Sequence, residues 1–361
     1  MLPKNKNLLD RRTRLRQIFP DCKIDSLLVL NINNIFYLSG FTGSEGILLL
    51  SRDATILFVD GRYTEQAALE TRGIEIREFT DEISAIAQKI KDLKLKRVGL
   101  EADAITLGTY HKLAGSLDKD KFVFLTGELR MLRACKDECE AAWMRKAAKI
   151  ASSAMKTVIQ KIEPGWTEKE TALQLEMHAR VSGADGLSFE TIVAAGKNSS
   201  LPHAKPTDRK IKKGDFVVID FGVRYKGYCS DETCTIAIGK LTDRQKNAYQ
   251  VVKEAHDCAL DAVAADVPAA EIDQKARRVF GKKYERYFVH GTGHGVGLEV
   301  HEPPRLSSTS KDILKPGMVF TVEPGLYIPG HWGIRIEDTI FLKENSCEKL
   351  TKMDKELTII E

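Results

Sequence analysis

The chain has 361 residues, of which 43% are hydrophobic and 29% charged, and its net charge is +4. This length exceeds the size at which a single core usually stops growing, so two domains are expected. The composition is that of an ordinary globular protein. The basic run at residues 209–213 leads into a Gly-Asp turn and is typical of a solvated loop, so nucleic-acid binding is not expected.

Membrane insertion and secretion are also disfavoured. No segment approaches the roughly 20 apolar residues of a membrane span, and the charged start lacks the apolar core of a signal peptide. The seven cysteines are scattered, with a CxxxC spacing at Cys135 and Cys139 and no CxxC. This pattern argues against a zinc knuckle or a disulfide framework and predicts a cytoplasmic protein.

Residues 1–132 are predicted to form a small α/β domain in which short strands and helices alternate. Nothing catalytic is apparent in this region. The expected helices lie at 62–71, 82–93 and 107–117, and the expected strands at 26–32, 35–39, 46–50, 55–60, 74–79, 97–101 and 122–125.

The second domain is predicted to cover residues 133–361. It opens with a long amphipathic helix at 137–162, which Pro164 and Gly165 end. A capping box of Thr167 and Glu170 starts the next helix, and Gly183 closes it. A strand is expected at 189–195, and amphipathic helices at 242–263 and 269–283.

The most informative stretch is 216–238, where two apolar, β-branched runs flank a short polar connection. This pattern predicts an antiparallel hairpin. With Lys226-Gly227 as the two-residue loop, Asp220 lies opposite Thr233, and Asp231 projects from the same face, roughly 7–8 Å away on the diagonal. Two such carboxylates on a buried strand pair repel each other and predict a cation between them. Two solvent-facing aspartates on an edge hairpin are the alternative.

Further candidate ligands follow this hairpin. The sequence FVHGTGHGVGLEVHE carries three histidines, His290, His294 and His301, with glycines at alternate positions that let backbone approach closely. A dinucleotide fingerprint fits poorly because this is not a strand-to-helix turn. An apolar strand then ends in Glu323, and a strand at 333–338 places Arg335 and Glu337 on one face.

Four carboxylates and one imidazole can therefore be collected into one site. Their charge matches two divalent cations, and oxygen-rich ligation suits Mn²⁺, with Co²⁺ and Zn²⁺ as alternatives. Such a metal pair carries out hydrolytic chemistry. The set is Asp220, Asp231, His294, Glu323 and Glu337.

Five ordered motifs resemble those of the pita-bread metallopeptidases, in particular aminopeptidase P and prolidase: SFETIVAAGKNSSLPHAKP, VVIDFG…GYCSDETCT, HGTGHGVGLEVHE, FTVEPGLY and GIRIED. The stretch FYLSGFTGSEG…DGRYTEQA is similar to the creatinase-like N-terminal domain of these enzymes. The resemblance implies an α/β (α+β) fold, with a small mixed-sheet N-terminal domain followed by a pita-bread catalytic domain.

The resemblance also implies roles for individual residues. Asp220 would chelate one metal, Asp231 and Glu337 would bridge both, and His294 and Glu323 would complete the second, around a bridging hydroxide. Glu323 would take the proton of the nucleophile. Three histidines would surround the substrate, Arg335 would support a bridging acid, and Tyr327 would line the site. The three histidines are His203, His290 and His301.

The function so implied is that of a homodimeric Xaa-Pro aminopeptidase acting on proline-containing peptides. A prolidase restricted to dipeptides shares every ligand and is the close alternative. A non-catalytic binding module or a metal-free hydrolase of the creatinase type is disfavoured because all five ligands are present, and no GxSxG motif indicates a serine hydrolase. One departure is Cys234, where the family often has arginine; it is expected to alternate away from the Asp231 face.

Overall fold

The computed structural model describes residues 5–361. The chain divides into two compact units, Met1–Arg133 and Ala134–Glu361, each of which is described by itself. Among the helices of residues 5–361, none combines the length and apolar character that crossing a membrane requires.

The first unit is built on one six-stranded mixed sheet in the order β4-β3-β2-β1-β5-β6. The β1–β2 and β2–β3 pairs are antiparallel, whereas β3–β4, β1–β5 and β5–β6 are parallel. The mixed sheet expected for this region is therefore confirmed. The elements are α1 (Asn5–Gln17), β1 (Ser26–Val29), α2 (Ile32–Ser39), β2 (Ile47–Ser51), β3 (Thr55–Val59), α3 (Thr64–Glu70), β4 (Glu75–Glu78), α4 (Glu82–Asp92), β5 (Val98–Glu101), α5 (Leu107–Ser116), the 3-10 helix η1 (Lys119–Lys121), β6 (Phe122–Leu125) and α6 (Glu128–Ala134).

One predicted strand of this unit is wrong. The stretch 35–39 was expected to be extended, but it forms the end of helix α2. The side chain of Asn31 accepts hydrogen bonds from the backbone N–H groups of Asn33 and Asn34, and Gly40 closes the helix at φ 79° with its N–H bonded to Phe36 O. These two caps outweigh the β preference of the residues between them. Helix α1 had no predicted counterpart.

The second unit contains four sheets and four α-helices within the described residues. Its elements are α7 (Glu138–Ile159), α8 (Glu168–Val181), β7 (Gly186–Leu187), β8 (Ile192–Ala195), η2 (Gly196–Ser200), β9 (Phe216–Asp220), β10 (Val223–Tyr225), β11 (Tyr228–Cys229), β12 (Thr233–Ile238), α9 (Asp243–Asp261), α10 (Ala269–Tyr284), η3 (Glu285–Tyr287), β13 (Gly293–Gly295), β14 (Glu302–Leu306), β15 (Val319–Val322), β16 (Gly325–Ile328), β17 (Trp332–Arg335), β18 (Asp338–Leu342), β19 (Cys347–Lys349) and β20 (Ile359–Ile360).

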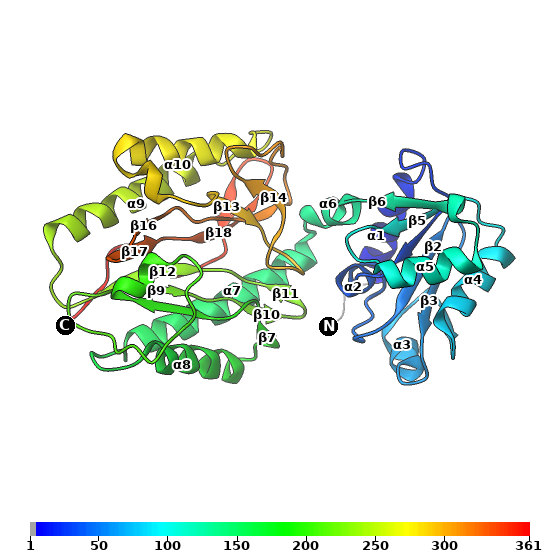
Figure 1. Ribbon diagram of the computed structural model, residues 1–361, viewed down its shortest axis with the longest axis horizontal. Coiled ribbons are helices and arrows are strands. Elements are labelled where there is room, and N and C mark those ends of the chain that lie inside the picture. Colours follow the sequence, from blue (N-terminus) through cyan, green and yellow to red (C-terminus); the bar gives the residue numbers. More distant parts are fainter. Residues whose placement is uncertain (1–4) are drawn as a thin grey trace. The chain divides into compact units, whose positions relative to one another are not determined.

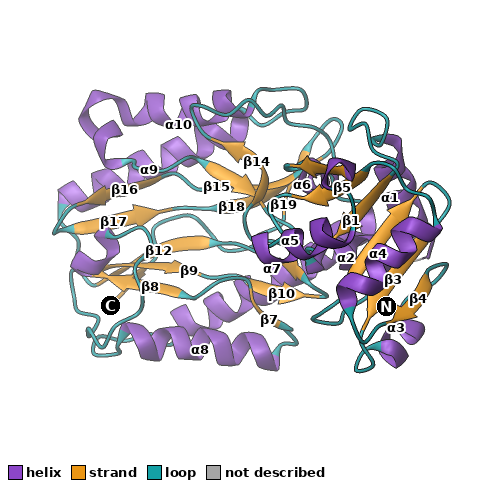
Figure 2. Ribbon diagram, turned by 45° about the vertical axis from the view of Figure 1, so that its right-hand side comes forward, coloured by secondary structure: helices purple, strands orange, loops and turns teal. Residues whose placement is uncertain are grey.

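The strands of this unit lie between two helix pairs, α7 with α8 on one side and α9 with α10 on the other (Figures 1 and 2). The two larger sheets have the orders β20-β12-β9-β8 and β14-β13-β15-β18-β19. This layered arrangement is the pita-bread fold that the resemblance implied. The capping boxes at Asp137, Thr167 and Thr242 fix where three of the helices begin.

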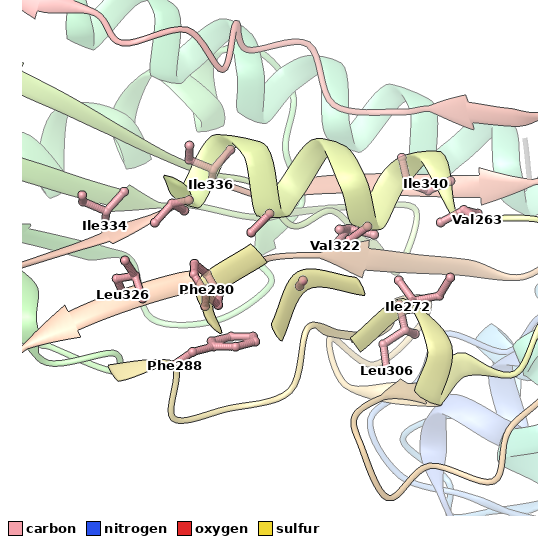
Figure 3. Packing of buried hydrophobic residues seen from close by; sticks show 14 of the residues in the cluster. Val263, Ile272, Phe280, Phe288, Leu306, Val322, Leu326, Ile334, Ile336 and Ile340 are labelled. Carbon is pink, nitrogen blue, oxygen red and sulfur yellow. The ribbon is translucent and has the colours of Figure 1, made fainter. Parts of the chain in front are cut away.

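Two hydrophobic clusters hold these layers together. One joins α7 and α8 to strands β8, β9 and β12, and includes Met155, Leu175 and Ile219. The other joins α9 and α10 to β15–β18; Figure 3 shows Ile272 and Phe280 of α10 in this cluster. The polar site residues come from the strands that these clusters hold in place.

The 216–238 hairpin has the register that its loop predicts. Tyr225 pairs with Tyr228 across Lys226 and Gly227, which have φ values of 54° and 81°, as a type I′ turn requires. In the same register Asp220 lies opposite Thr233. The ladder is interrupted at Gly222, where a Cβ atom would lie 2.1 Å from Ser230 O. The hairpin therefore passes from the four-stranded sheet into the three-stranded sheet β11-β10-β7.

The single strand expected at 333–338 is two strands. Strand β17 ends at Arg335 and β18 begins at Asp338. Between them the N–H of Glu337 is bonded to Thr233 O at 3.1 Å, so this segment joins the hairpin instead of continuing a ladder. A long-range hydrogen bond of this kind leaves no trace in the local alternation of side chains.

Candidate metal centre and active site

Four of the five candidate ligands lie at or beside strand ends in the second unit, and the fifth lies within a short strand. Asp220 is the last residue of β9, Asp231 precedes β12, and Glu337 precedes β18. Glu323 follows β15, and His294 is the middle residue of β13. Strand ends from two sheets therefore place donor atoms at one point.

Three of these residues form the one metal-competent group found among residues 5–361. Single ligand atoms of Asp231, His294 and Glu337 all lie within 4.8 Å of one another. Glu323 joins them, since its Oε1 is 3.3 Å from His294 Nε2, which is itself 3.7 Å from Asp231 Oδ2. The structure thus brings four of the five predicted ligands into direct proximity.

The electrostatics of this group call for a cation. Burial raises the pKa of Asp231 well above its ordinary value, and the negative charges of Glu337, Asp220 and Glu323 raise it further. Burial likewise raises the pKa of Glu337, with Glu323 and Asp220 adding to the effect. Asp220 Oδ1 is buried without a hydrogen-bond partner. Buried carboxylates that repel one another are what a divalent cation neutralises.

His294 is oriented as a nitrogen ligand. Its Nδ1 lies 3.1 Å from the carbonyl oxygen of Gly295, which only accepts hydrogen bonds, so Nδ1 carries the proton. Burial lowers the pKa of His294, which favours the neutral ring. The Nε2 lone pair therefore faces the carboxylates of Asp231 and Glu323, a contact that is unfavourable unless a cation lies between them. The donor set fits a divalent metal ion.

Arg335 offsets part of the negative charge of the site from within the protein. Its side chain is 4% exposed, and Nη2 lies 2.5 Å from Asp220 Oδ2. Nε donates to Thr233 Oγ1 at 3.2 Å, and Nη1 donates to Tyr327 OH at 2.7 Å and to Pro202 O at 3.0 Å. Burial would lower the pKa of Arg335, but the pKa is raised because Tyr327, Asp220 and Glu323 surround the guanidinium. The guanidinium group of Arg335 thus connects Asp220, Tyr327 and the loop that contains Pro202.

Tyr327 and His290 extend this chain of hydrogen bonds. His290 Nδ1 lies 2.7 Å from Gly291 O and so carries the ring proton, which leaves Nε2 to accept from Tyr327 OH at 2.9 Å. Burial lowers the pKa of His290 and raises that of Tyr327 to about 12. Both groups are neutral near pH 7, and both nitrogens of His290 have a partner in this structure.

The alternate glycines allow the histidine-bearing strand to fit between its neighbours. A Cβ atom on Gly293 would lie 1.9 Å from Thr321 O, and one on Gly295 would lie 2.1 Å from Pro303 O. Side chains at these positions would push β13 off β14 and β15. His294, which lies between the two glycines, is held in place by this close approach.

The two remaining predicted histidines are exposed but lie within reach of the same centre. The rings of His301 and His294 are 4.3 Å apart in an edge-on arrangement. Partial burial of its ring and the neighbouring His294 lower the pKa of His301. His203 acts electrostatically on both His290 and His301, so all three histidines surround one region.

Cys234 lies away from the ligands, as its alternation predicts. It pairs with Ile219 and packs in the cluster under α7 and α8. Burial raises the pKa of its thiol to about 12, so it is a neutral core residue. The side chain that differs from the common family residue therefore contacts the core and not the donor atoms.

Two threonines were missed as site residues. Thr233 Oγ1 donates to Glu337 Oε2 at 2.6 Å, and Thr321 Oγ1 accepts from the N–H of His294 at 3.1 Å and lies 3.3 Å from Glu323 Oε1. A signal was present, because each threonine stands two residues from a ligand and so shares its face of a strand.

Helix α10 also supports the site through residues that sequence reasoning did not select. Asp273 Oδ1 accepts from the N–H and hydroxyl of Thr292 at 3.0 and 2.9 Å. Arg277 Nη2 donates to His290 O at 2.7 Å. An acid and a base four residues apart on an amphipathic helix are typical of a surface ion pair, so their sequence pattern gives no indication of this role.

Comparison with known families agrees with this geometry. Residues 142–344 match the model of metallopeptidase family M24, and residues 11–135 match the creatinase/prolidase N-terminal domain. Among relatives, the chain is 41% identical to the uncharacterized peptidase YqhT of Bacillus subtilis, over 96% of this chain and 99% of that protein. It is 37% identical to the Xaa-Pro dipeptidase of Pyrococcus horikoshii, over 92% and 94%.

Solved structures show the same relationship. An Xaa-Pro dipeptidase from Bacillus anthracis superposes with a TM-score of 0.95 at 39% identity, covering 98% of this chain and all of that one. An X-Pro aminopeptidase from Thermotoga maritima superposes with a TM-score of 0.89, also at 39% identity, covering 97% and 100%. The family model spans more than half of the chain, and these relatives cover nearly all of it. The chain therefore belongs to metallopeptidase family M24, a family of metal-dependent hydrolases, and carries the creatinase/prolidase N-terminal domain.

Proposed function

We propose that this protein is a divalent-metal-dependent exopeptidase that hydrolyses the Xaa-Pro bond at the N-terminus of peptides. The observation that carries the proposal is the convergence of Asp231, His294 and Glu337 within 4.8 Å in an M24 chain. Two cations are proposed, with Mn²⁺ as the first choice. Their ligands would be Asp220, Asp231, His294, Glu323 and Glu337.

Divalent cations, when bound, polarise the scissile carbonyl and lower the pKa of the attacking water. Glu323 is the proposed base that takes a proton from this water. His203 and His301, the exposed members of this group of histidines, are the proposed donors to the carbonyl oxygen and the departing proline nitrogen.

The remaining polar residues position these groups. Arg335 holds Asp220 and Tyr327, and Tyr327 fixes the ring of His290. His290 is proposed to contact substrate after it exchanges one of its present hydrogen bonds. This arrangement suits a tertiary amide that offers no N–H after the cleaved bond, because the carbonyl and the free amine are the groups to be recognised.

Two specificities share this site. The sequence motifs placed an aminopeptidase first and a dipeptidase second. The relatives named Xaa-Pro dipeptidase, at 37% identity from Pyrococcus horikoshii and at 39% identity with a TM-score of 0.95 from Bacillus anthracis, favour the dipeptidase. We therefore propose Xaa-Pro dipeptides as the preferred substrates, with longer peptides as the alternative. Homodimer formation and a cytoplasmic location stay predictions.

The test is hydrolysis of Ala-Pro and of Ala-Pro-Ala by the metal-stripped protein after addition of Mn²⁺, with Ala-Ala as the control. We expect turnover of Ala-Pro, slower or no turnover of Ala-Pro-Ala, and none of Ala-Ala. Faster cleavage of the tripeptide would replace the dipeptidase by the aminopeptidase. Failure to cleave either proline peptide with Mn²⁺, Co²⁺ or Zn²⁺ would overturn the proposal.

A further inference from the structure

Two of the proposed metal ligands, Asp231 and Glu337, are each followed in the chain by a second, fully buried acid. Glu232 follows Asp231, and Asp338 follows Glu337; the side chains of Glu232 and Asp338 are 0% exposed. Neither belongs to the metal-competent group. Because neighbouring side chains on extended backbone point to opposite sides, these two acids lie behind the metal centre.

A single lysine lies between these two rear acids. Lys355 Nζ is 2.8 Å from Glu232 Oε1 and 3.5 Å from Asp338 Oδ1, and its side chain is 4% exposed. Lys355 belongs to the segment that follows β19, beyond residues 142–344, where the M24 family model matches. None of the roles derived above uses this segment.

The same segment supplies further contacts to both acids. The N–H of Met353 donates to Glu232 Oε1 at 2.9 Å, and Thr351 Oγ1 donates to Asp338 Oδ1 at 2.5 Å. Lys355 is itself fixed by its carbonyl oxygen, which accepts from Tyr249 OH of α9 at 3.0 Å. The ammonium group therefore has a defined position between the two acids.

The position of this lysine matters because its two partners belong to different sheets. Glu232 precedes β12 of the sheet β20-β12-β9-β8, whereas Asp338 begins β18 of the sheet β14-β13-β15-β18-β19. No ladder pairs β12 with β18 among the described strands. On the metal side, Thr339 Oγ1 donates to Asp231 O at 2.7 Å, and the N–H of Glu337 donates to Thr233 O. On the other side the connection is made by residues 351–355, in which the ammonium group of Lys355 contacts both acids.

We propose that Lys355 is a positioning residue of the metal centre, which sets the spacing of Asp231 and Glu337 from behind by binding Glu232 and Asp338 together. The inference rests on the proposed metal-dependent function. Metal ligands must be held within about 0.5 Å of their working geometry, and contacts outside the ligand sphere provide this precision.

The two possible roles of Lys355, as a nearby positive charge and as a connection between sheets, predict opposite changes in metal affinity when Lys355 is replaced. Loss of a nearby positive charge by itself strengthens the attraction of the site for cations. Loss of the connection between two sheets lets the ligands separate and weakens metal binding. The direction of the change in metal affinity therefore distinguishes a positioning residue from a counter-ion.

The experiment compares Lys355→Met with Lys349→Met in the full-length protein. Lys349 is the matched control because its ammonium group lies 3.2 Å from Asp338 Oδ2 but its side chain is 48% exposed. Mn²⁺ binding to the metal-stripped proteins is measured by titration calorimetry. We expect Lys355→Met to raise the Kd for Mn²⁺ roughly ten- to a hundredfold, the usual effect of losing a contact behind a metal ligand. Lys349→Met is expected to change this Kd less than about threefold, as for an exposed ion pair.

A second readout separates positioning from general damage. At saturating Mn²⁺ the Lys355→Met protein is expected to recover kcat and KM for Ala-Pro, because bound metal restores the ligand spacing. An unchanged or lower Kd for Mn²⁺ in Lys355→Met, whatever its thermal stability, would overturn the inference. If this variant does not fold, Lys355→Arg, which keeps the positive charge and changes the position of the donor atoms, is measured instead; a raised Kd for Mn²⁺ supports the inference and an unchanged Kd overturns it.

Measurements of Mn²⁺ binding and Ala-Pro cleavage by the wild-type protein test the proposed function separately from the role of Lys355. Wild-type protein that neither binds Mn²⁺ nor cleaves Ala-Pro would refute the function itself. Wild-type protein that does both, with Lys355→Met of equal Mn²⁺ affinity, would refute only the role of Lys355.

Discussion

At the scale of single residues, the chemistry of the site follows from carboxylates buried close together, where their negative charges destabilise the folded protein. Burial and mutual repulsion raise the pKa values of Asp231 and Glu337, and Arg335 offsets only part of the negative charge of the centre. The metal-free site is therefore strained electrostatically, and the same residues that bind a cation lower the stability of the protein without one.

The first prediction concerns Asp231→Asn, which keeps the shape of the side chain and removes its charge. Metal content after dialysis is expected to fall, and hydrolysis of Ala-Pro to drop at least about a hundredfold, as for loss of a group that acts in catalysis. The metal-free variant should unfold at a denaturant concentration no lower than that of metal-free wild type, because a buried repulsion has been removed. Elemental analysis and urea denaturation measure both effects.

The control is Asp208→Asn, because the side chain of Asp208 is 84% exposed and its ion-pair partner, Lys169, is also exposed. It should leave metal content and turnover unchanged. Normal metal content in Asp231→Asn would contradict the assignment of this residue as a ligand.

Most of the candidate ligands could be predicted from the sequence, because an acidic residue within an apolar strand pattern stands out from its neighbours. Asp220 and Asp231 stand out within 216–238, and their register follows from the Lys226-Gly227 turn, which the structure confirms. Lys355 could not be chosen. Glu232 lies more than one hundred residues before Lys355 in the sequence, and Asp338 begins a strand of a different sheet from the one that Glu232 precedes. Only the tertiary contacts therefore show the position of Lys355 between them.

At the scale of elements, the site depends on how closely strands approach one another. Strand β13 lies against both β14 and β15, and glycine is required where backbone atoms would otherwise meet a side chain. The spacing of glycines was visible in the sequence, whereas the neighbours that require it were not.

The second prediction concerns Gly293→Ala in this strand. The new Cβ would lie 1.9 Å from Thr321 O, a backbone atom that cannot rotate away. Stability is expected to fall by about 1–3 kcal/mol, the usual range for overpacking, and Mn²⁺ affinity to fall because the next residue is His294. Urea denaturation and Mn²⁺ titration measure the two effects.

Gly115→Ala is the matched control, since nothing lies within 4 Å of the position that its Cβ would occupy. It lies in helix α5, where alanine is the better helix former. Its stability should be unchanged or slightly higher. Equal behaviour of the two variants would contradict the importance of close approach at Gly293.

The third prediction concerns the connection between α7 and β19. Arg145 binds Glu348 through two hydrogen bonds of 2.7 and 2.8 Å, and Lys343 Nζ lies 2.8 Å from the same carboxylate. Arg145 lowers the pKa of Glu348 to about 2, from an ordinary value of 4.5. Because the pKa is lower in the folded state, this stabilisation is complete above pH 4.5 and is lost as the pH falls toward 2.

Glu348→Gln should therefore lower the free energy of unfolding at pH 7 by about 1 kcal/mol, a modest value because water screens the partly exposed pair. The difference from wild type should shrink between pH 5 and pH 3. Urea denaturation across this range measures it, and a difference that stays constant with pH would show that charge is not its cause.

Element boundaries illustrate where local sequence is insufficient. Residues 35–39 carry the β-branched and aromatic side chains of a strand, yet the caps at Asn31 and Gly40 make them helical. Those caps were present in the sequence and could have been used. The break between β17 and β18 could not, because it depends on the hydrogen bond from Glu337 to Thr233.

At the scale of the whole molecule, the candidate site lies within the second of the two units, and no metal-competent group was found in residues 5–133 of the first. The two larger sheets of the catalytic unit pack against different helix pairs, and the proposed metal ligands come from both. Bound metal would therefore act as a cross-link between these sheets, in addition to its chemical role.

The last prediction follows from this cross-link. Removal of metal by a chelator should destabilise the protein, because a ligand that binds only the folded state at a hundred times its Kd contributes about 2.7 kcal/mol. For a domain of this size that corresponds to roughly 5–10 °C in Tm. The loss should be local: amide hydrogen exchange should accelerate in β9, β12, β15 and β18, while β1 and β5 of the first unit keep their protection. Lys355→Met in saturating Mn²⁺ should resemble wild type in these strands, and without metal it should exchange faster than wild type. Uniform acceleration across both units would mean that the metal stabilises the chain by some route other than joining the two sheets.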